Sequence, residues 1–116
     1  MNDQVLHIGI IVENDTDFQC LKILIKKIEP AKQFSLKRRV AGGGGNMFNI
    51  LKMEQWTKSL HADNCHFLLI VHDLDRDGVT KELNDKNKLM DKLKNALEKN
   101  PINKICIVVP IEELEA

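Results

Sequence analysis

The sequence contains no tyrosine and only one tryptophan, so chemistry that proceeds through a covalent phosphotyrosine is excluded for this chain. It also lacks an excess of either charge, because 17 basic and 17 acidic residues give a formal net charge of zero. Bulk charge therefore cannot drive binding to nucleic acid or to an anionic membrane, and such binding must come from a local cluster.

Long apolar segments and an even set of cysteines are missing as well. The apolar runs are too short to cross a bilayer, and the N-terminus has no basic start, so we expect no membrane span and no signal peptide. Cys20, Cys65 and Cys106 are an odd number without the CxxC spacing of a zinc site. We interpret them as reduced core residues of a cytoplasmic protein.

The chain has 116 residues, 43% of them hydrophobic, which suits a single folded domain over 1–116. Three runs that are apolar on both faces are typical of central strands in a parallel sheet, and one imperfectly alternating run suits a strand near an edge. The central candidates are Leu6–Val12, Phe67–Val71 and Ile105–Val109, and the edge candidate is Phe34–Val40.

Between these runs lie three stretches with apolar residues at helical spacing. The first follows the capping-box pair Thr16 and Gln19 and ends before Pro30, the second follows Asn46 as its cap, and the third covers 83–98. The order β-α-β-α-β-α-β predicts an α/β, Rossmann-like fold, with a mostly parallel four-stranded sheet flanked by about three helices. The order of the strands in the sheet stays open.

Acidic residues follow three of the expected strands. Because parallel strands end at one edge, these carboxylates should gather there and resist ionising together unless a cation joins them. Mg²⁺ accepts a few carboxylate oxygens and leaves positions for phosphate, and Mn²⁺ is a possible substitute. The residues concerned are Glu13 after the first strand, Asp73, Asp75 and Asp77 after the third, and Glu112, Glu113 and Glu115 after the fourth.

Other interpretations of these acids stay open. Asp15, Asp17 and Asp77 equally suit helix caps or a solvated loop, and the C-terminal glutamates suit the first turn of a helix. The run from Asp73 to Gly78 also matches the first half of an EF-hand loop. Asn84 at its twelfth position and the preceding strand count against a calcium site.

The motifs together resemble the Toprim domain, the fold shared by primases, topoisomerases, small RNA-maturation nucleases and the overcoming-lysogenisation-defect nucleases. Glu13 and Asp17 match its Glu-Gly-x-x-Asp signature, with Asn14 in place of glycine; asparagine tolerates a left-handed backbone better than most residues, so the turn can be kept. Asp73 and Asp75 match its Asp-x-Asp signature. The tail from Val109 resembles a segment that opens a helix in related putative nucleases, so we expect the C-terminus to be truncated.

The resemblance implies a metal-dependent nuclease acting on DNA or RNA. Asp73 and Asp75 would bind Mg²⁺, Glu13 would be a ligand or the general acid/base, and Asp77 would assist the metal site. Glu112 or Glu115 would be a further ligand. With no tyrosine, water is the favoured nucleophile. The alternatives are a non-catalytic Toprim-like module that binds metal or a partner within a larger defence or repair protein, and, less favoured, a phosphorelay receiver.

Contacts to nucleic acid are expected near the same edge. The tight basic run Lys37, Arg38 and Arg39 precedes a glycine turn in which Gly43 and Gly44 expose amides to phosphate, unless the turn is simply a connector. His72 would orient Asp73 or contact a phosphate, or be a packed strand-end histidine. The expected partners are DNA or RNA, with homo-oligomers or additional domains left open. The lysines of the third helix suit a solvated face: Lys86, Lys88, Lys92 and Lys94.

Overall fold

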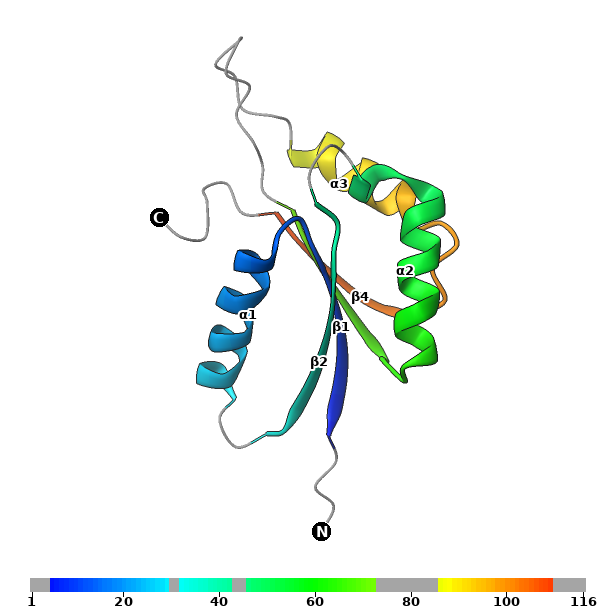
Figure 1. Ribbon diagram of the computed structural model, residues 1–116. Coiled ribbons are helices and arrows are strands. Elements are labelled where there is room, and N and C mark those ends of the chain that lie inside the picture. Colours follow the sequence, from blue (N-terminus) through cyan, green and yellow to red (C-terminus); the bar gives the residue numbers. More distant parts are fainter. Residues whose placement is uncertain (1–4, 30–31, 43–45, 73–85, 110–116) are drawn as a thin grey trace.

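The computed structural model describes residues 5–29, 32–42, 46–72 and 86–109, which form a four-stranded, all-parallel sheet with helices on both faces (Figure 1). The sheet order is β2-β1-β3-β4, and the predicted Rossmann-like α/β class is confirmed. The predicted edge position of β2 is confirmed too. The strands are β1 (Leu6–Val12), β2 (Phe34–Val40), β3 (Phe67–Val71) and β4 (Lys104–Val108).

The helices divide unequally between the two faces of the sheet. One covers the face formed by the even-numbered residues of β1, and the other two cover the opposite face, which carries the larger buried cluster (Figure 1). No helix in the described ranges is long and apolar enough to cross a membrane. The helices are α1 (Asp15–Ile28) on the first face, α2 (Ile50–Ala62) and α3 (Lys86–Ala96) on the second, and the short 3-10 helix η1 (Asn46–Phe48) before α2.

Both helix starts that the sequence predicted are displaced. α1 is capped by Asn14, whose side-chain oxygen accepts the backbone N–H of Asp17 at 3.1 Å, so Thr16 lies inside the first turn. Asn14 has φ −144°, an extended backbone, so the left-handed conformation that asparagine would tolerate is not adopted there. In α2 the cap is Asn49, which accepts the N–H of Lys52, whereas Asn46 begins η1. In each case the residue with the extended backbone acts as the cap, because its side chain can turn back onto the helix.

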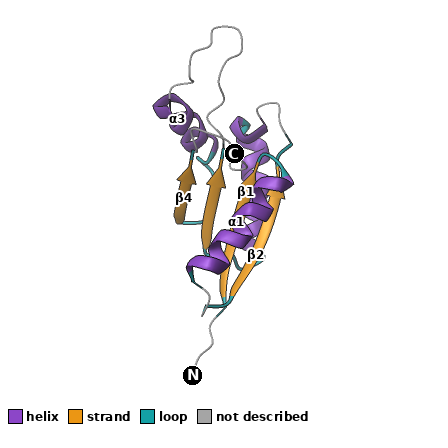
Figure 2. Ribbon diagram, turned by 90° about the vertical axis from the view of Figure 1, so that its left-hand side faces the viewer, coloured by secondary structure: helices purple, strands orange, loops and turns teal. Residues whose placement is uncertain are grey.

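The predicted central position of the fourth strand is wrong, because β4 lies at the edge of the sheet. Figure 2 shows α1 in front of β1 and β2, with β4 clear of it. Ile105 and Val108 are accordingly 42% and 38% exposed. Apolarity on both faces shows that a strand can be covered on both faces, but it does not specify how many neighbours the strand has.

The cysteines differ in their surroundings, so their interpretation as core residues holds for only one of them. Cys65 is fully buried, Cys20 is half-buried, and Cys106 is exposed on β4; all three are free thiols. Burial raises the pKa of the Cys65 thiol, since the charged thiolate loses its hydration there.

The centre of the sheet is tightly packed where β1 passes beneath α2. A Cβ placed on Gly9 would lie 2.9 Å from Cδ1 of Leu60, a fully buried residue of α2. Glycine is therefore required at this position by the approach of the helix rather than by backbone conformation. This packing fixes the position of α2 against β1.

Candidate functional site

The carboxyl edge of the sheet brings the ends of β1 and β3 together. Val12 pairs with Val71 in the parallel register, so Glu13 and His72 are the first residues beyond the same rung of the ladder. The sequence predicted that these two strands end at one edge. It did not predict that they are immediate neighbours, because the strand order was open.

Glu13 and His72 are in contact across this edge. Oε1 of Glu13 lies 3.5 Å from Nδ1 of His72, and their side chains are 22% and 9% exposed. The pair is an ion pair only when the imidazole is protonated; a neutral Nδ1–H can still donate to the carboxylate at this longer distance. The carboxylate is thus held by a nearly buried ring while part of it faces the open edge.

The imidazole is fixed by its surroundings. Its ring packs against that of Phe48 in η1, with centroids 5.0 Å apart and planes tilted by 34°. The backbone N–H of His72 donates to the carbonyl of Val108 at 3.1 Å, which continues the ladder between β3 and β4. These contacts confirm that His72 is a packed strand-end histidine. Its partner among the described acids is Glu13, and no spacing in the sequence indicates this pairing.

The backbone of Glu13 is held from the other side by the segment after β2. Its carbonyl accepts the N–H of Gly42 at 2.8 Å, one rung beyond the bond from Ala41 to Val12. Gly42 has φ +83°, a left-handed conformation that favours glycine. Asn46 donates its side-chain amide to the carbonyl of Ala41 at 2.7 Å. Ala41 and Gly42 are thereby bonded to the end of β1, and Asn46 is bonded to Ala41.

Two lysines near this edge were not selected from the sequence as site residues. Nζ of Lys52, in the first turn of α2, donates to the side-chain oxygen of Asn46 at 2.7 Å. Nζ of Lys92, on α3, lies 5.5 Å from the centroid of the Phe48 ring. Lys92 belongs to the solvated face that the sequence predicted, and it is exposed. No local sequence signal marks either lysine, because their positions depend on how η1 packs between α2 and α3.

Of the two aspartates in the first turn of α1, Asp17 is buried and Asp15 is not. Asp17 is 7% exposed and its backbone N–H donates to the cap Asn14, whereas Asp15 is exposed and pairs with Arg38. Both residues therefore belong to the helix and not to a solvated loop, and neither is its N-cap, which is Asn14. Both carboxylates lie in the first turn, where negative charge is favourable to the helix dipole.

The basic run on β2 is divided between the two faces of the sheet. Arg38 lies on the α1 side, with its guanidinium 5.0 Å from the Phe18 ring and Nε 3.0 Å from Oδ1 of Asp15. Arg39 lies on the α2 side, where Nη2 donates to Ser59 at 2.6 Å and to Asp63 at 3.3 Å. Lys37 is exposed. The three charges therefore do not form one patch, since neighbouring strand residues point to opposite faces.

Several predicted site residues lie outside the described part of the chain. Among the residues that are described, no group of three His, Cys, Asp or Glu is placed to hold a metal ion. Glu13 is the one predicted metal ligand whose surroundings are known. The residues outside the described ranges are Asp73, Asp75, Asp77, Glu112, Glu115, Gly43 and Gly44.

Comparisons with known protein families, with curated proteins and with solved structures find no match to this chain. Function must therefore be argued from the residues themselves. Their geometry defines an α/β protein with a carboxylate–imidazole pair at the carboxyl edge of a parallel sheet, the edge at which such sheets bind ligands.

Proposed function

We propose that the chain is a Toprim-like, Mg²⁺-dependent phosphoryl-transfer domain that hydrolyses phosphodiester bonds in DNA or RNA. The observation that carries the proposal is the contact between Glu13, at the end of β1, and His72, at the end of β3. Asp73 follows His72 directly in the sequence, and Asp75 stands two positions further on. Glu13, the acid of the first Toprim-like signature, therefore lies beside the end of β3, and the second signature, Asp73 and Asp75, follows β3 in the sequence.

The donor set suits a hard divalent cation. Glu13 offers a partly exposed carboxylate at the edge, and carboxylate oxygens are the ligands that Mg²⁺ prefers in proteins. Glu13, Asp73 and Asp75 would hold the ion, with Asp77 and Glu112 or Glu115 as further acidic groups near it. His72 would keep the Glu13 carboxylate in one orientation, the usual task of a hydrogen-bonding neighbour of a metal ligand. Mg²⁺ supplies stabilisation of negative charge on the phosphoryl group.

The protein's own groups would bind and position the phosphodiester. Lys52 and Lys92 place positive charge near the edge, where they can contact phosphates. Because the sequence has no tyrosine, water is the nucleophile in this proposal, and Glu13 would accept its proton in the alternative in which it does not bind the ion. A cytoplasmic location is proposed with it, since all three cysteines are free.

The test is cleavage of labelled single- and double-stranded DNA and RNA while Mg²⁺ or Mn²⁺ is titrated. We expect metal-dependent cleavage by the wild type. A loss of about 100-fold or more is expected in Asp73→Asn/Asp75→Asn, since a catalytic metal contributes several kcal/mol to the transition state. Asp91→Asn removes an exposed carboxylate on α3 and serves as the matched control. Metal-independent cleavage, or equal cleavage by all variants, would contradict the proposal. Metal binding without cleavage would favour the non-catalytic module.

A further inference from the structure

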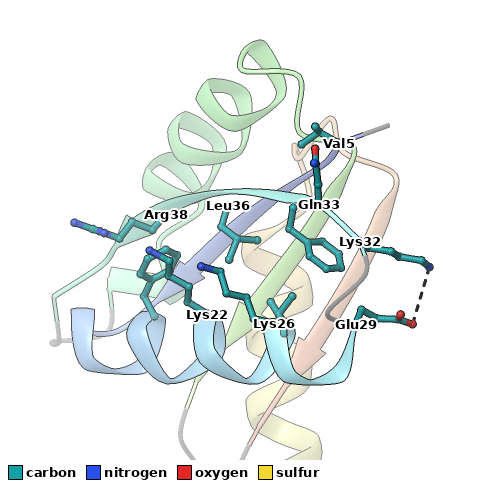
Figure 3. A pocket seen from close by; sticks show the side chains of 11 residues that line it. Val5, Lys22, Lys26, Glu29, Lys32, Gln33, Leu36 and Arg38 are labelled. Carbon is teal, nitrogen blue, oxygen red and sulfur yellow. Dashed lines mark ion pairs between the residues drawn. The ribbon is translucent and has the colours of Figure 1, made fainter. Parts of the chain in front are cut away.

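A groove lies between α1 and the edge strand β2, away from the face covered by α2 and α3 (Figure 3). Its volume is about 870 Å³. Apolar side chains from both elements line it, among them Ile25 of α1 and Phe34 and Leu36 of β2. The groove therefore offers an apolar surface that is open to solvent, and Phe34 places an aromatic ring in it.

Cations surround this apolar surface. Lys22 and Lys26 lie one helical turn apart on α1, and Figure 3 shows both side chains reaching from the helix toward β2. Lys32 and Arg38 line the groove from the β2 side, and Glu29, 4.0 Å from Lys32, is the acid among the lining residues. In a chain with zero net charge, this excess of positive charge is a local feature of the kind that binds polyanions.

The groove extends along β2 as far as Arg38, two residues before the strand ends at Val40. Arg38, at its end nearest the carboxyl edge, pairs with Asp15 at 3.0 Å. Asp15 is the first residue of α1 and stands two positions after Glu13 in the sequence. A chain lying in the groove would therefore extend toward the edge at which Glu13 and His72 meet.

We propose that this groove binds single-stranded nucleic acid, with Lys22 and Lys26 on the phosphates and the bases against Phe34 and its apolar neighbours. The inference rests on the proposed function and names the strandedness and the path of its substrate. A basic groove with an aromatic surface is the usual platform for single strands. In a duplex the bases are stacked on one another, so their faces could not contact the apolar surface of the groove. Nucleic acid is favoured over an acidic peptide because the proposed function places phosphodiester cleavage at the edge of the sheet toward which Arg38 lies.

Binding is measured by fluorescence anisotropy with a labelled oligothymidylate of about 16 nucleotides, the upper end of common site sizes. The buffer contains EDTA, so that no cleavage occurs. Lys22→Gln/Lys26→Gln should weaken binding about tenfold or more at low salt and reduce the log–log salt slope by about 1.4, for two lost phosphate contacts. Phe34→Leu should weaken binding about fivefold and leave the salt slope unchanged. The control Lys27→Gln/Lys99→Gln removes two exposed charges outside the groove and should bind like the wild type.

Four results would overturn the inference: no binding of the oligonucleotide, an equal loss in the control, duplex binding as strong as single-strand binding, or an acidic peptide bound in place of the oligonucleotide. The inference about the groove and the proposed nuclease function can be tested separately. If Asp73→Asn/Asp75→Asn binds the oligonucleotide normally but neither the wild type nor any variant cleaves nucleic acid, the groove is supported as a binding site and the nuclease function is contradicted. If Lys22→Gln/Lys26→Gln cleaves single strands with an unchanged KM, the nuclease function is supported and binding of the substrate in the groove is contradicted.

Discussion

At the scale of single residues, burial separates side chains that the sequence treats alike. Cys65 and Cys106 both lie in or beside apolar segments, yet one is fully buried and the other is exposed on an edge strand. Asp15 and Asp17 stand two positions apart in one helical turn, and only Asp17 is buried. Composition and spacing identify these residues as candidates. Their surroundings depend on which elements pack against them, which a short sequence window does not contain.

The raised pKa of Cys65 predicts a loss of stability at alkaline pH. The buried thiol keeps its proton to a higher pH than the same thiol in the unfolded chain, so the native state binds more protons once the unfolded thiol begins to ionise. Stability from this source is complete below the ordinary thiol pKa of about 8.5 and falls above it, by at most about 1.4 kcal/mol per pH unit.

The measurement is the urea midpoint between about pH 7 and 10, across the ordinary thiol pKa. Cys65→Ala should be less stable than the wild type at neutral pH, because it leaves a cavity, but its curve should be flatter above that pKa. Cys106→Ala removes an exposed thiol and should run parallel to the wild type. Parallel curves for all three proteins would show that burial of Cys65 has no effect on its titration.

At the scale of elements, the sequence predicted the strands better than the helix starts. β1, β2 and β3 have the predicted bounds, because a short apolar run between polar segments has clear ends. β4 is displaced by one residue, to Lys104–Val108. Helix starts were less certain, since Asn, Asp and Thr all follow β1 and each is a competent cap. The choice depends on which residue leaves the strand with an extended backbone.

The caps supply a prediction at this scale. Asn14→Ala should lower the free energy of unfolding by about 1 kcal/mol, because it removes the acceptor for the N–H of Asp17. Thr16→Ala lies inside the first turn and should cost less, since alanine is the better helix former there. Urea denaturation of both variants and of Asn14→Asp, which keeps a capping oxygen, checks this. A larger loss of unfolding free energy for Thr16→Ala than for Asn14→Ala would instead support the capping box of Thr16 and Gln19 that the sequence suggested.

At the scale of the whole molecule, the sequence predicted the class of fold and the edge that carries Glu13, but not the neighbours across that edge. The contact between Glu13 and His72 follows from the order β2-β1-β3-β4, which long-range packing decides. The basic run was predicted as a unit, although strand alternation sends Arg38 and Arg39 to opposite faces. Their acidic partners are contributed by α1 and by the end of α2, so pattern alone could not identify them.

Metal linkage is a prediction for the molecule as a whole. If Mg²⁺ or Mn²⁺ binds only the native state, a concentration 100 times its Kd should raise the free energy of unfolding by about 2.7 kcal/mol. The midpoint temperature of thermal unfolding of the wild type should rise as a result. Glu13→Gln and Asp73→Asn/Asp75→Asn should lose the increase, and Asp91→Asn should retain it. Stabilisation by Ca²⁺ far above that by Mg²⁺ would instead support a calcium loop beginning at Asp73.

The unequal covering of the sheet determines where the molecule opens first. Among the described strands, β2 and β4 each have one hydrogen-bonded neighbour, but α1 lies over β2, whereas β4 is clear of it (Figure 2) and carries the exposed apolar residues Ile105 and Val108. Amide protons of β4 should therefore exchange with solvent through small local openings, and those of β1 only when the whole domain unfolds. Hydrogen-exchange rates should fall from β4 toward β1, so that the rim through which the sheet loosens lies two strands away from Glu13.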